Sequence, residues 1–210
     1  MAILDLDALR TTEVSEDPFP HVIVPGFVPP RQLDAVLGAL PEMAKGGSFP
    51  IGSLRLGQTA QEMLHELEGL AFRNVIAQKF DLDLTGATTM TTLRGRSREK
   101  DGRIHCDSTA KRVTVLLYLN RETDAWSAHQ GCLRLLRQPD SLDDYVTEVP
   151  PVNGTLLVFP NSSHAWHGHK QFVGPRYVVQ LNYMTGDAAA RSELRRHRIS
   201  AFLKKLTQAA

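Results

Sequence analysis

Hydrophobic positions follow two different periods along the chain, and the change falls near residue 87. Before this point, apolar residues recur every three to four positions, as they do in helices that bury one face. After it, β-branched and aromatic residues form short runs separated by Gly, Pro, Asn, Asp and Ser. The pattern therefore predicts helices first and an antiparallel, β-rich portion afterwards.

Helical periodicity is confined mainly to residues 30–80. A short entry strand within residues 19–30 ends at prolines, and residues 31–43 then place their apolar side chains on one helical face. Residues 58–80 repeat the period over a longer stretch, which we expect to be interrupted near Gly69. We expect both helices to cover a sheet.

The β-rich portion contains several runs of strand-forming residues, at positions 87–96, 111–120, 131–137, 154–160 and 176–184. Short runs divided by turn residues are typical of an antiparallel sandwich or barrel. Because no internal repeat or low-complexity linker divides the chain, we expect residues 1–210 to form one domain. Its β core is expected to extend over about residues 87–186.

Composition and charge narrow the class of protein. A hydrophobic content of 42% suffices for a sizeable core, and a net charge of +1 predicts no general attraction to nucleic acid or membranes. The first residues do not resemble a signal peptide, and no apolar run is long enough to span a bilayer. Cys106 and Cys132 lack paired metal spacing. We therefore expect a soluble, cytoplasmic protein.

A basic amphipathic helix is predicted at residues 190–208. Its apolar residues fall near one side, and six basic residues lie elsewhere. We expect the helix to pack through its apolar stripe and to leave its charges in solvent; docking of an acidic partner is the alternative.

The candidate chemistry begins with His105 and Asp107, which immediately precede a strand. Side chains two residues apart in an extended segment leave the same side of the backbone and can bind one ion. A later segment supplies His164, His167 and His169. Two histidines and one carboxylate suit non-heme Fe(II), with positions left for substrate and oxygen. The residue types alone leave open which of the three histidines completes the set.

Polar residues on the last predicted strand indicate a second part of the site. In residues 176–184, Arg176, Gln180 and Asn182 share one face, which is either solvated or lines a pocket. We favour a pocket in which Arg176 binds a carboxylate through paired hydrogen bonds. The strand that follows His105 and Asp107 places Thr114, Tyr118 and Asn120 on one face. These side chains either contact a cosubstrate and the candidate ligands or pack in the core.

Taken in order, these motifs resemble the Fe(II)- and 2-oxoglutarate-dependent dioxygenases, most closely their prolyl-4-hydroxylase-like branch. The matching segments are "HCD" at 105–107, "YLN" at 118–120, "GCLRLL" at 131–136, "GTLLVFPNSSHAWHGH" at 154–169 and "GPRYVVQLNY" at 174–183. The family pattern has a second histidine some fifty to sixty residues after the carboxylate and a basic residue nine or ten further on. His167 and Arg176 have this spacing, whereas His164 and His169 do not.

The resemblance implies a double-stranded β-helix, the jelly-roll, cupin-like core of the family, with helices outside. It implies His105, Asp107 and His167 as iron ligands and Arg176 as the residue that binds the distal carboxylate of 2-oxoglutarate. Other side chains expected to line the cosubstrate pocket are Tyr118, Asn120, Gln180 and Asn182.

The resemblance also implies a reaction. Fe(II), 2-oxoglutarate and O2 would hydroxylate an unactivated C–H bond and release succinate and CO2. Asp107 favours hydroxylation, because related halogenases carry a small residue at that position. The substrate is open: a small molecule, a sugar, a lipid or a protein side chain. The alternatives are a non-catalytic β-sandwich binding module and a cupin-type metal enzyme that does not use 2-oxoglutarate.

Overall fold

The structure is a computed structural model, and it describes residues 2–122, 130–196 and 199. The helices are α1 (Leu6–Thr11), α2 (Pro30–Gly38), the 3-10 turn η1 (Ile51–Ser53), α3 (Gln58–Leu67) and α4 (Leu70–Lys79). The strands are β1 (Val22–Val24), β2 (Phe49–Pro50), β3 (Thr89–Ser97), β4 (Lys111–Tyr118), β5 (Leu133–Leu136), β6 (Tyr145–Val149), β7 (Leu156–Pro160), β8 (Trp166–His169) and β9 (Gly174–Met184).

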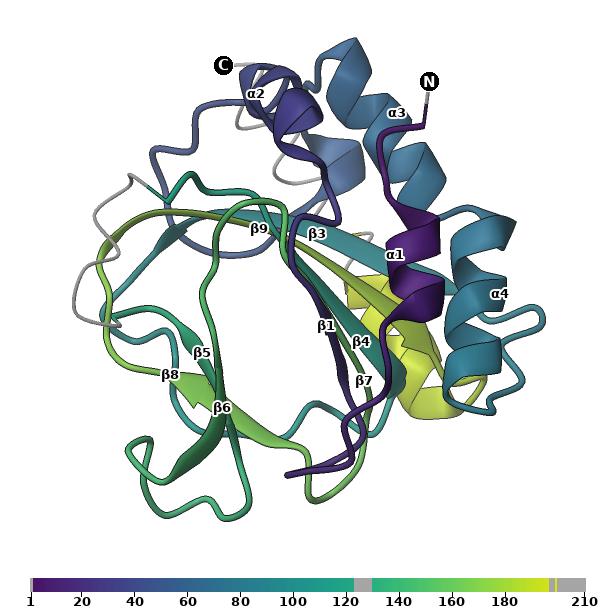
Figure 1. The fold of residues 1–210 in the computed structure, drawn as a ribbon, viewed down its shortest axis with the longest axis vertical. Helices are drawn as coiled ribbons and strands as arrows, with labels where there is room; N and C mark the ends of the chain where they lie inside the picture. The colour runs from purple at the N-terminus through teal and green to yellow at the C-terminus, as the bar shows by residue number, and fades with distance from the viewer. Residues whose placement is uncertain (1, 123–129, 197–198, 200–210) are drawn as a thin grey trace.

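Two antiparallel sheets face each other. The larger has the strand order β1-β7-β4-β9-β3-β2, and helices α1 to α4 lie against its outer side (Figure 1). The smaller has the order β6-β5-β8. An isolated antiparallel bridge between His105 and His167 adds the segment before β4 to the free edge of β8. Four central strands of the larger sheet thus oppose three strands and a bridge, which is the double-stranded β-helix predicted from the motifs.

The larger sheet buries both of its faces, because its strands separate two apolar clusters. On β4, Val113, Val115 and Leu117 join the cluster beneath the helices, whereas Leu116 and Tyr118 join the cluster between the sheets. This alternation places side chains of opposite parity on opposite faces. The polar face of β9 is therefore directed between the two sheets rather than into solvent.

Most of the long predicted elements are confirmed, and several short ones were not foreseen. The helical stretch 58–80 is divided into α3 and α4, and Gly69 is the N-cap of α4. The elements α1, β2, β6 and β8 were not predicted from the sequence. Residues 188–196 are helical, as expected for the C-terminal helix, but most of the predicted span 190–208 lies outside the described residues. Within the described part, no helix is long and apolar enough to cross a bilayer.

Candidate metal and cosubstrate site

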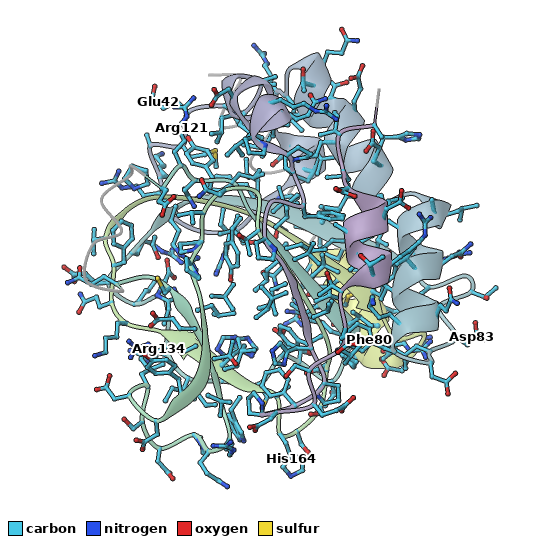
Figure 2. All side chains as sticks on the ribbon, in the orientation of Figure 1. Glu42, Phe80, Asp83, Arg121, Arg134 and His164 are labelled. Atoms are coloured by element: carbon cyan, nitrogen blue, oxygen red, sulfur yellow. The ribbon has the colours of Figure 1, made fainter. Side chains whose placement is uncertain are left out.

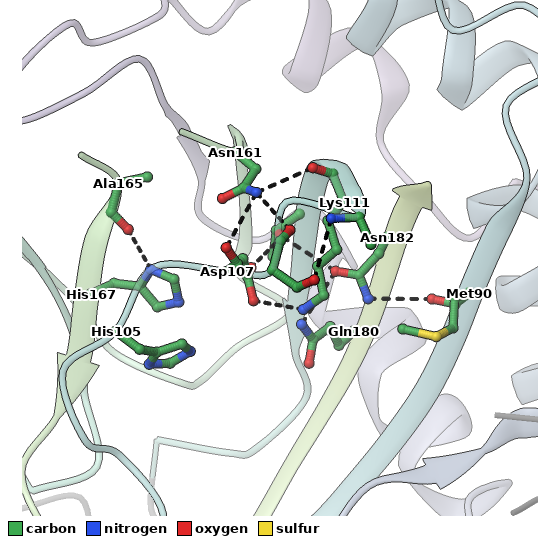
Figure 3. A network of polar contacts seen from close by, with 12 residues as sticks. Met90, His105, Asp107, Lys111, Asn161, Ala165, His167, Gln180 and Asn182 are labelled. Carbon is green, nitrogen blue, oxygen red and sulfur yellow. Dashed lines mark hydrogen bonds and ion pairs between the residues drawn. The ribbon is translucent and has the colours of Figure 1, made fainter. Parts of the chain in front are cut away.

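Three side chains with metal-binding atoms converge between the sheets. His105 and Asp107 come from the segment that joins β3 to β4, and His167 comes from β8. One potential ligand atom from each lies within 4.8 Å of the others (Figure 3). No other such group of three His, Cys, Asp or Glu residues occurs in the described parts of the chain.

Main-chain contacts fix the two imidazoles. The backbones of His105 and His167 exchange two N–H···O hydrogen bonds of 3.0 Å, and their ring centroids are 4.4 Å apart. The Nδ1 atom of His105 lies 2.9 Å from the Arg103 carbonyl oxygen, and that of His167 lies 2.8 Å from the Ala165 carbonyl oxygen. Each Nδ1 thus carries the proton as donor, which leaves both Nε2 lone pairs for an ion.

A glycine permits this pairing. A Cβ atom at Gly168 would lie 2.8 Å from the Gly102 carbonyl oxygen and 3.2 Å from the Ile104 Cα atom. Real Cβ atoms do not approach backbone oxygen so closely. Gly168 therefore allows the segment that carries His105 to lie directly on β8.

The Asp107 carboxylate is buried and held ionised. Lys111 Nζ lies 2.6 Å from Oδ1, and the Thr114 hydroxyl donates to Oδ2. Burial alone would raise the pKa of Asp107, but the charges of Lys111 and His167 and these hydrogen bonds lower it overall. Each carboxylate oxygen has a second lone pair, so these contacts leave capacity for an ion.

Lys111 and Asn161 are residues of the site that the sequence analysis missed. The Asn161 Nδ2 atom donates to the carbonyl oxygens of Ser108 and Lys111, at 2.8 and 3.2 Å, and so holds the turn between Asp107 and β4 (Figure 3). That turn brings Lys111 back onto Asp107. The only sequence feature that could have indicated this contact is a lysine four residues after a carboxylate. In an extended chain, however, these two side chains would not meet.

The three histidines of the later segment lie in different environments. His164 is exposed on the turn before β8, at the periphery of the molecule, with Nδ1 3.1 Å from the Ser163 hydroxyl (Figure 2). His167 is buried beside His105 and Asp107. His169 is also buried, and the charges that act on it are those of Arg176, Arg94 and Asp101. Burial first, and then Arg176, lowers the pKa of His169 to about 4.

Arg176 is the second main feature of the site. The residue is 7% exposed, and its Nε atom donates to the Gly131 carbonyl oxygen at 3.0 Å. The Cζ atom lies 5.4 Å from the centroid of the Tyr118 ring, and the two side chains influence each other's pKa. The buried Tyr118 hydroxyl makes no hydrogen bond of good geometry in the structure. No carboxylate pairs with Arg176 among residues 2–122 and 130–196. Burial lowers the pKa of this guanidinium and raises that of Tyr118 to about 12.

The other predicted pocket residues divide into two groups. Gln180 and Asn182 lie on the same face as Arg176, and Gln180 Nε2 donates to Asn182 Oδ1 at 3.3 Å. Asn120 differs from the expectation. Its amide accepts from the Tyr177 N–H and donates to the carbonyl oxygens of Pro151 and Tyr177, so it joins backbone segments instead of lining the pocket.

The donor set fits Fe(II). Two imidazole nitrogens and one carboxylate oxygen on one side of an ion are the ligands of non-heme Fe(II) oxygenases, which leave the remaining positions open. Here His167 is buried, whereas His105 is exposed to solvent. The unmatched guanidinium of Arg176 and the free hydroxyl of Tyr118 fit a carboxylate-bearing cosubstrate. A buried cation without an acidic partner and a buried hydroxyl without a well-formed hydrogen bond are each unfavourable unless a ligand satisfies them.

Comparison with known proteins agrees with this geometry. Residues 94–184, which include all the site residues described above, match the model of the 2OG-Fe(II) oxygenase superfamily. The match confirms the resemblance found in the motifs, and it implies Fe(II), 2-oxoglutarate and O2 as cofactors. No curated protein sequence matches the chain significantly.

Solved structures share the fold at low sequence identity. A prolyl 4-hydroxylase from Phytophthora capsici has a TM-score of 0.57 at 14% identity, over 96% of this chain and 77% of that one. A Trichoplax adhaerens prolyl hydroxylase, solved with a hypoxia inducible factor peptide fragment, has a TM-score of 0.52 at 20% identity, over 89% of each chain. A Pseudomonas putida prolyl-4-hydroxylase has a TM-score of 0.50 at 19% identity, over 86% of this chain and 90% of that one. These likenesses establish the jelly-roll fold.

Proposed function

We propose that this protein is an Fe(II)- and 2-oxoglutarate-dependent hydroxylase, formed by one domain, that acts on an unactivated C–H bond. His105, Asp107 and His167 would hold the iron, and Arg176 would bind the distal carboxylate of 2-oxoglutarate. The observation that carries the proposal is the buried Arg176 guanidinium, which lacks an acidic partner among the described residues and shares the space between the sheets with the His-Asp-His cluster.

The residues of the chain have separable tasks in this proposal. The carbonyl oxygens of Arg103 and Ala165 orient the two imidazoles, and Lys111 and Thr114 keep Asp107 ionised and in place. When bound, the iron and its cosubstrate supply the oxidation, in which 2-oxoglutarate is converted to succinate and CO2.

The cosubstrate would be positioned by side chains of β4 and β9. Arg176 retains the donors of its terminal nitrogens, and the Tyr118 hydroxyl is available beside them. Apolar side chains between the sheets, among them Leu116, Val178 and Phe159, exclude water and strengthen these polar contacts.

Two other functions are distinguished by the same residues. A binding module that keeps the fold without a metal has no need for three converging ligands with oriented imidazoles. A cupin-type enzyme that does not use 2-oxoglutarate has no need for a buried, unpaired arginine, because such a charge is costly without its ligand. The presence of both features favours the oxygenase.

The test is an anaerobic titration of the full chain with Fe(II) and 2-oxoglutarate, followed by the weak visible charge-transfer band of the iron chelate. We expect the band in the wild type. Succinate should then form when O2 is admitted. If saturating Fe(II) and 2-oxoglutarate give no band, the binding module becomes the better description. A band that persists in Arg176→Gln at unchanged 2-oxoglutarate affinity would remove Arg176 from the site.

A further inference from the structure

A second arginine lies beside Arg176 on the neighbouring strand. In the pairing of β3 with β9, Arg94 is opposite Val178, and Val178 is two residues from Arg176. Residues diagonal to one another on the same face of an antiparallel pair are roughly 7 to 8 Å apart at their backbones, within reach of long side chains. The two guanidinium groups therefore belong to one part of the site.

The direction of Arg94 follows from its neighbour Gly95. A Cβ atom at Gly95 would lie 2.4 Å from Met43 Cβ and 3.1 Å from Tyr177 Cε1, which are on the helical side of the larger sheet. Successive residues of a strand point to opposite faces, so Arg94 is directed between the sheets. A register shift follows between Arg94 and Arg96, and such bulges often redirect side chains beside active sites.

Arg94 has no acidic partner within the described residues. The charge of Arg94 helps to lower the pKa of Asp101, but that carboxylate forms its hydrogen bonds with Arg98, at 2.9 and 3.1 Å. The positions of β3 and β9 that share the inner face with Arg94 include Thr92, Gln180 and Asn182 and carry no acidic side chain. Burial is the main cause of the lowered pKa of Arg176, and the charge of Arg94 lowers this pKa further. Tyr118 acts in the opposite direction and raises it.

The charges in this part of the site do not balance when only the cosubstrate is counted. The distal carboxylate of 2-oxoglutarate would match Arg176, which leaves the half-buried Arg94 unmatched. A guanidinium without a partner in a partly buried place is a binding group for a carboxylate or a phosphate.

We propose that Arg94 binds an anionic group of the substrate, so that the enzyme hydroxylates a small molecule bearing a carboxylate or a phosphate. This inference rests on the proposed function and adds a substrate class to it. The opposite class is a neutral internal stretch of peptide, which would leave Arg94 unmatched.

Binding of simple anions tests the proposal without knowledge of the substrate. The full chain is loaded with Fe(II) and saturating 2-oxoglutarate in the absence of O2, and inorganic phosphate and acetate are titrated separately by calorimetry. We expect at least one anion to bind the wild type and to bind Arg94→Gln about tenfold or more weakly, because a charge-assisted hydrogen bond is lost. Arg31→Gln, which removes an exposed arginine of α2, is the control and should bind as the wild type does. Phosphate and acetate distinguish the two kinds of anionic group.

Three results would overturn the inference. One is that the wild type binds neither anion, or binds them no more tightly than Arg94→Gln does. Another is a loss of 2-oxoglutarate affinity in Arg94→Gln as large as in Arg176→Gln, which would assign Arg94 to the cosubstrate. The third is succinate formation stimulated equally in the wild type and Arg94→Gln by a prolyl peptide blocked at both ends. Failure of the wild type to bind 2-oxoglutarate would instead refute the proposed function itself.

Discussion

Replacing Arg176 by Met should change stability and ligand binding in opposite directions. Without ligand, the substitution removes one hydrogen bond to Gly131, worth about 1 kcal/mol, and also removes a buried cation that lacks an acidic partner among the described residues. Replacing buried charges by apolar residues of similar volume is often neutral or stabilising by about 1 to 4 kcal/mol. We therefore expect the unfolding free energy of the ligand-free protein to stay constant or rise by up to about 3 kcal/mol.

The affinity for 2-oxoglutarate should fall in the same variant. Losing one partner of a buried charge pair costs roughly 2 to 5 kcal/mol, a factor of about 30 to 5,000 in affinity. With Fe(II) present, 2-oxoglutarate at one hundred times its dissociation constant stabilises the wild type by about 2.7 kcal/mol. The same concentration should stabilise Arg176→Met by less than about 1 kcal/mol.

Anaerobic urea denaturation with and without 2-oxoglutarate measures both effects. Arg134→Met is the matched control, because Arg134 is equally buried but bound to Glu148 and Asp143 at 2.7 and 2.9 Å. Breaking that cluster should destabilise the ligand-free protein by about 3 kcal/mol and leave the gain from 2-oxoglutarate unchanged. Equal stabilisation of Arg176→Met and wild type by 2-oxoglutarate would refute the reasoning.

The remaining predictions concern the metal ligands. Asp107→Asn should weaken Fe(II) binding by more than the roughly 10- to 100-fold typical of losing an outer-shell partner; wild-type affinity in calorimetry would contradict this. His167→Ala should lose iron and succinate formation, whereas His164→Ala and His169→Ala should retain iron; the reverse result for His167 and His169 would reassign the ligand. Burial lowers the pKa of His167 and His169 to about 4 from an ordinary value of 6.5. The unfolded chain therefore binds more protons between these pH values, and the metal-free protein should lose up to about 1.4 kcal/mol of stability per pH unit per histidine as pH falls from 6.5 to 4. Urea denaturation across this pH range should show that the free energy of unfolding depends less steeply on pH in His169→Asn than in the wild type.

The sequence predicted what depends on local periodicity and missed what depends on pairing. Long helices and hydrophobic strands were identified because their side-chain pattern persists over several turns or alternations. The segment Trp166–His169 has no strand composition; it is a strand because β5 pairs with it. Asn120 was placed in the pocket because the alternation of β4 was extended past Tyr118, where the strand ends.

Within the site, the motif spacing identified His105, Asp107, His167 and Arg176 as candidates, and the structure brings the first three together. Lys111 could not be found in this way, because its contact with Asp107 depends on the turn held by Asn161, which follows β7. Nothing in the sequence distinguishes Arg94, since an isolated arginine on a strand is most often solvated. Its orientation became evident only from the surroundings of Gly95.

The bridge between His105 and His167 makes these two candidate metal ligands part of the sheet. Both residues bind each other through the main chain and offer their side chains to one ion, although 62 residues separate them in sequence. An ion held by both would act as a cross-link, and closing a loop of this length with a covalent bond restricts the unfolded chain by on the order of 4 kcal/mol. Amide hydrogen exchange at His105 and His167 would then slow when iron binds, so that the edge of the smaller sheet reports whether the metal centre is filled.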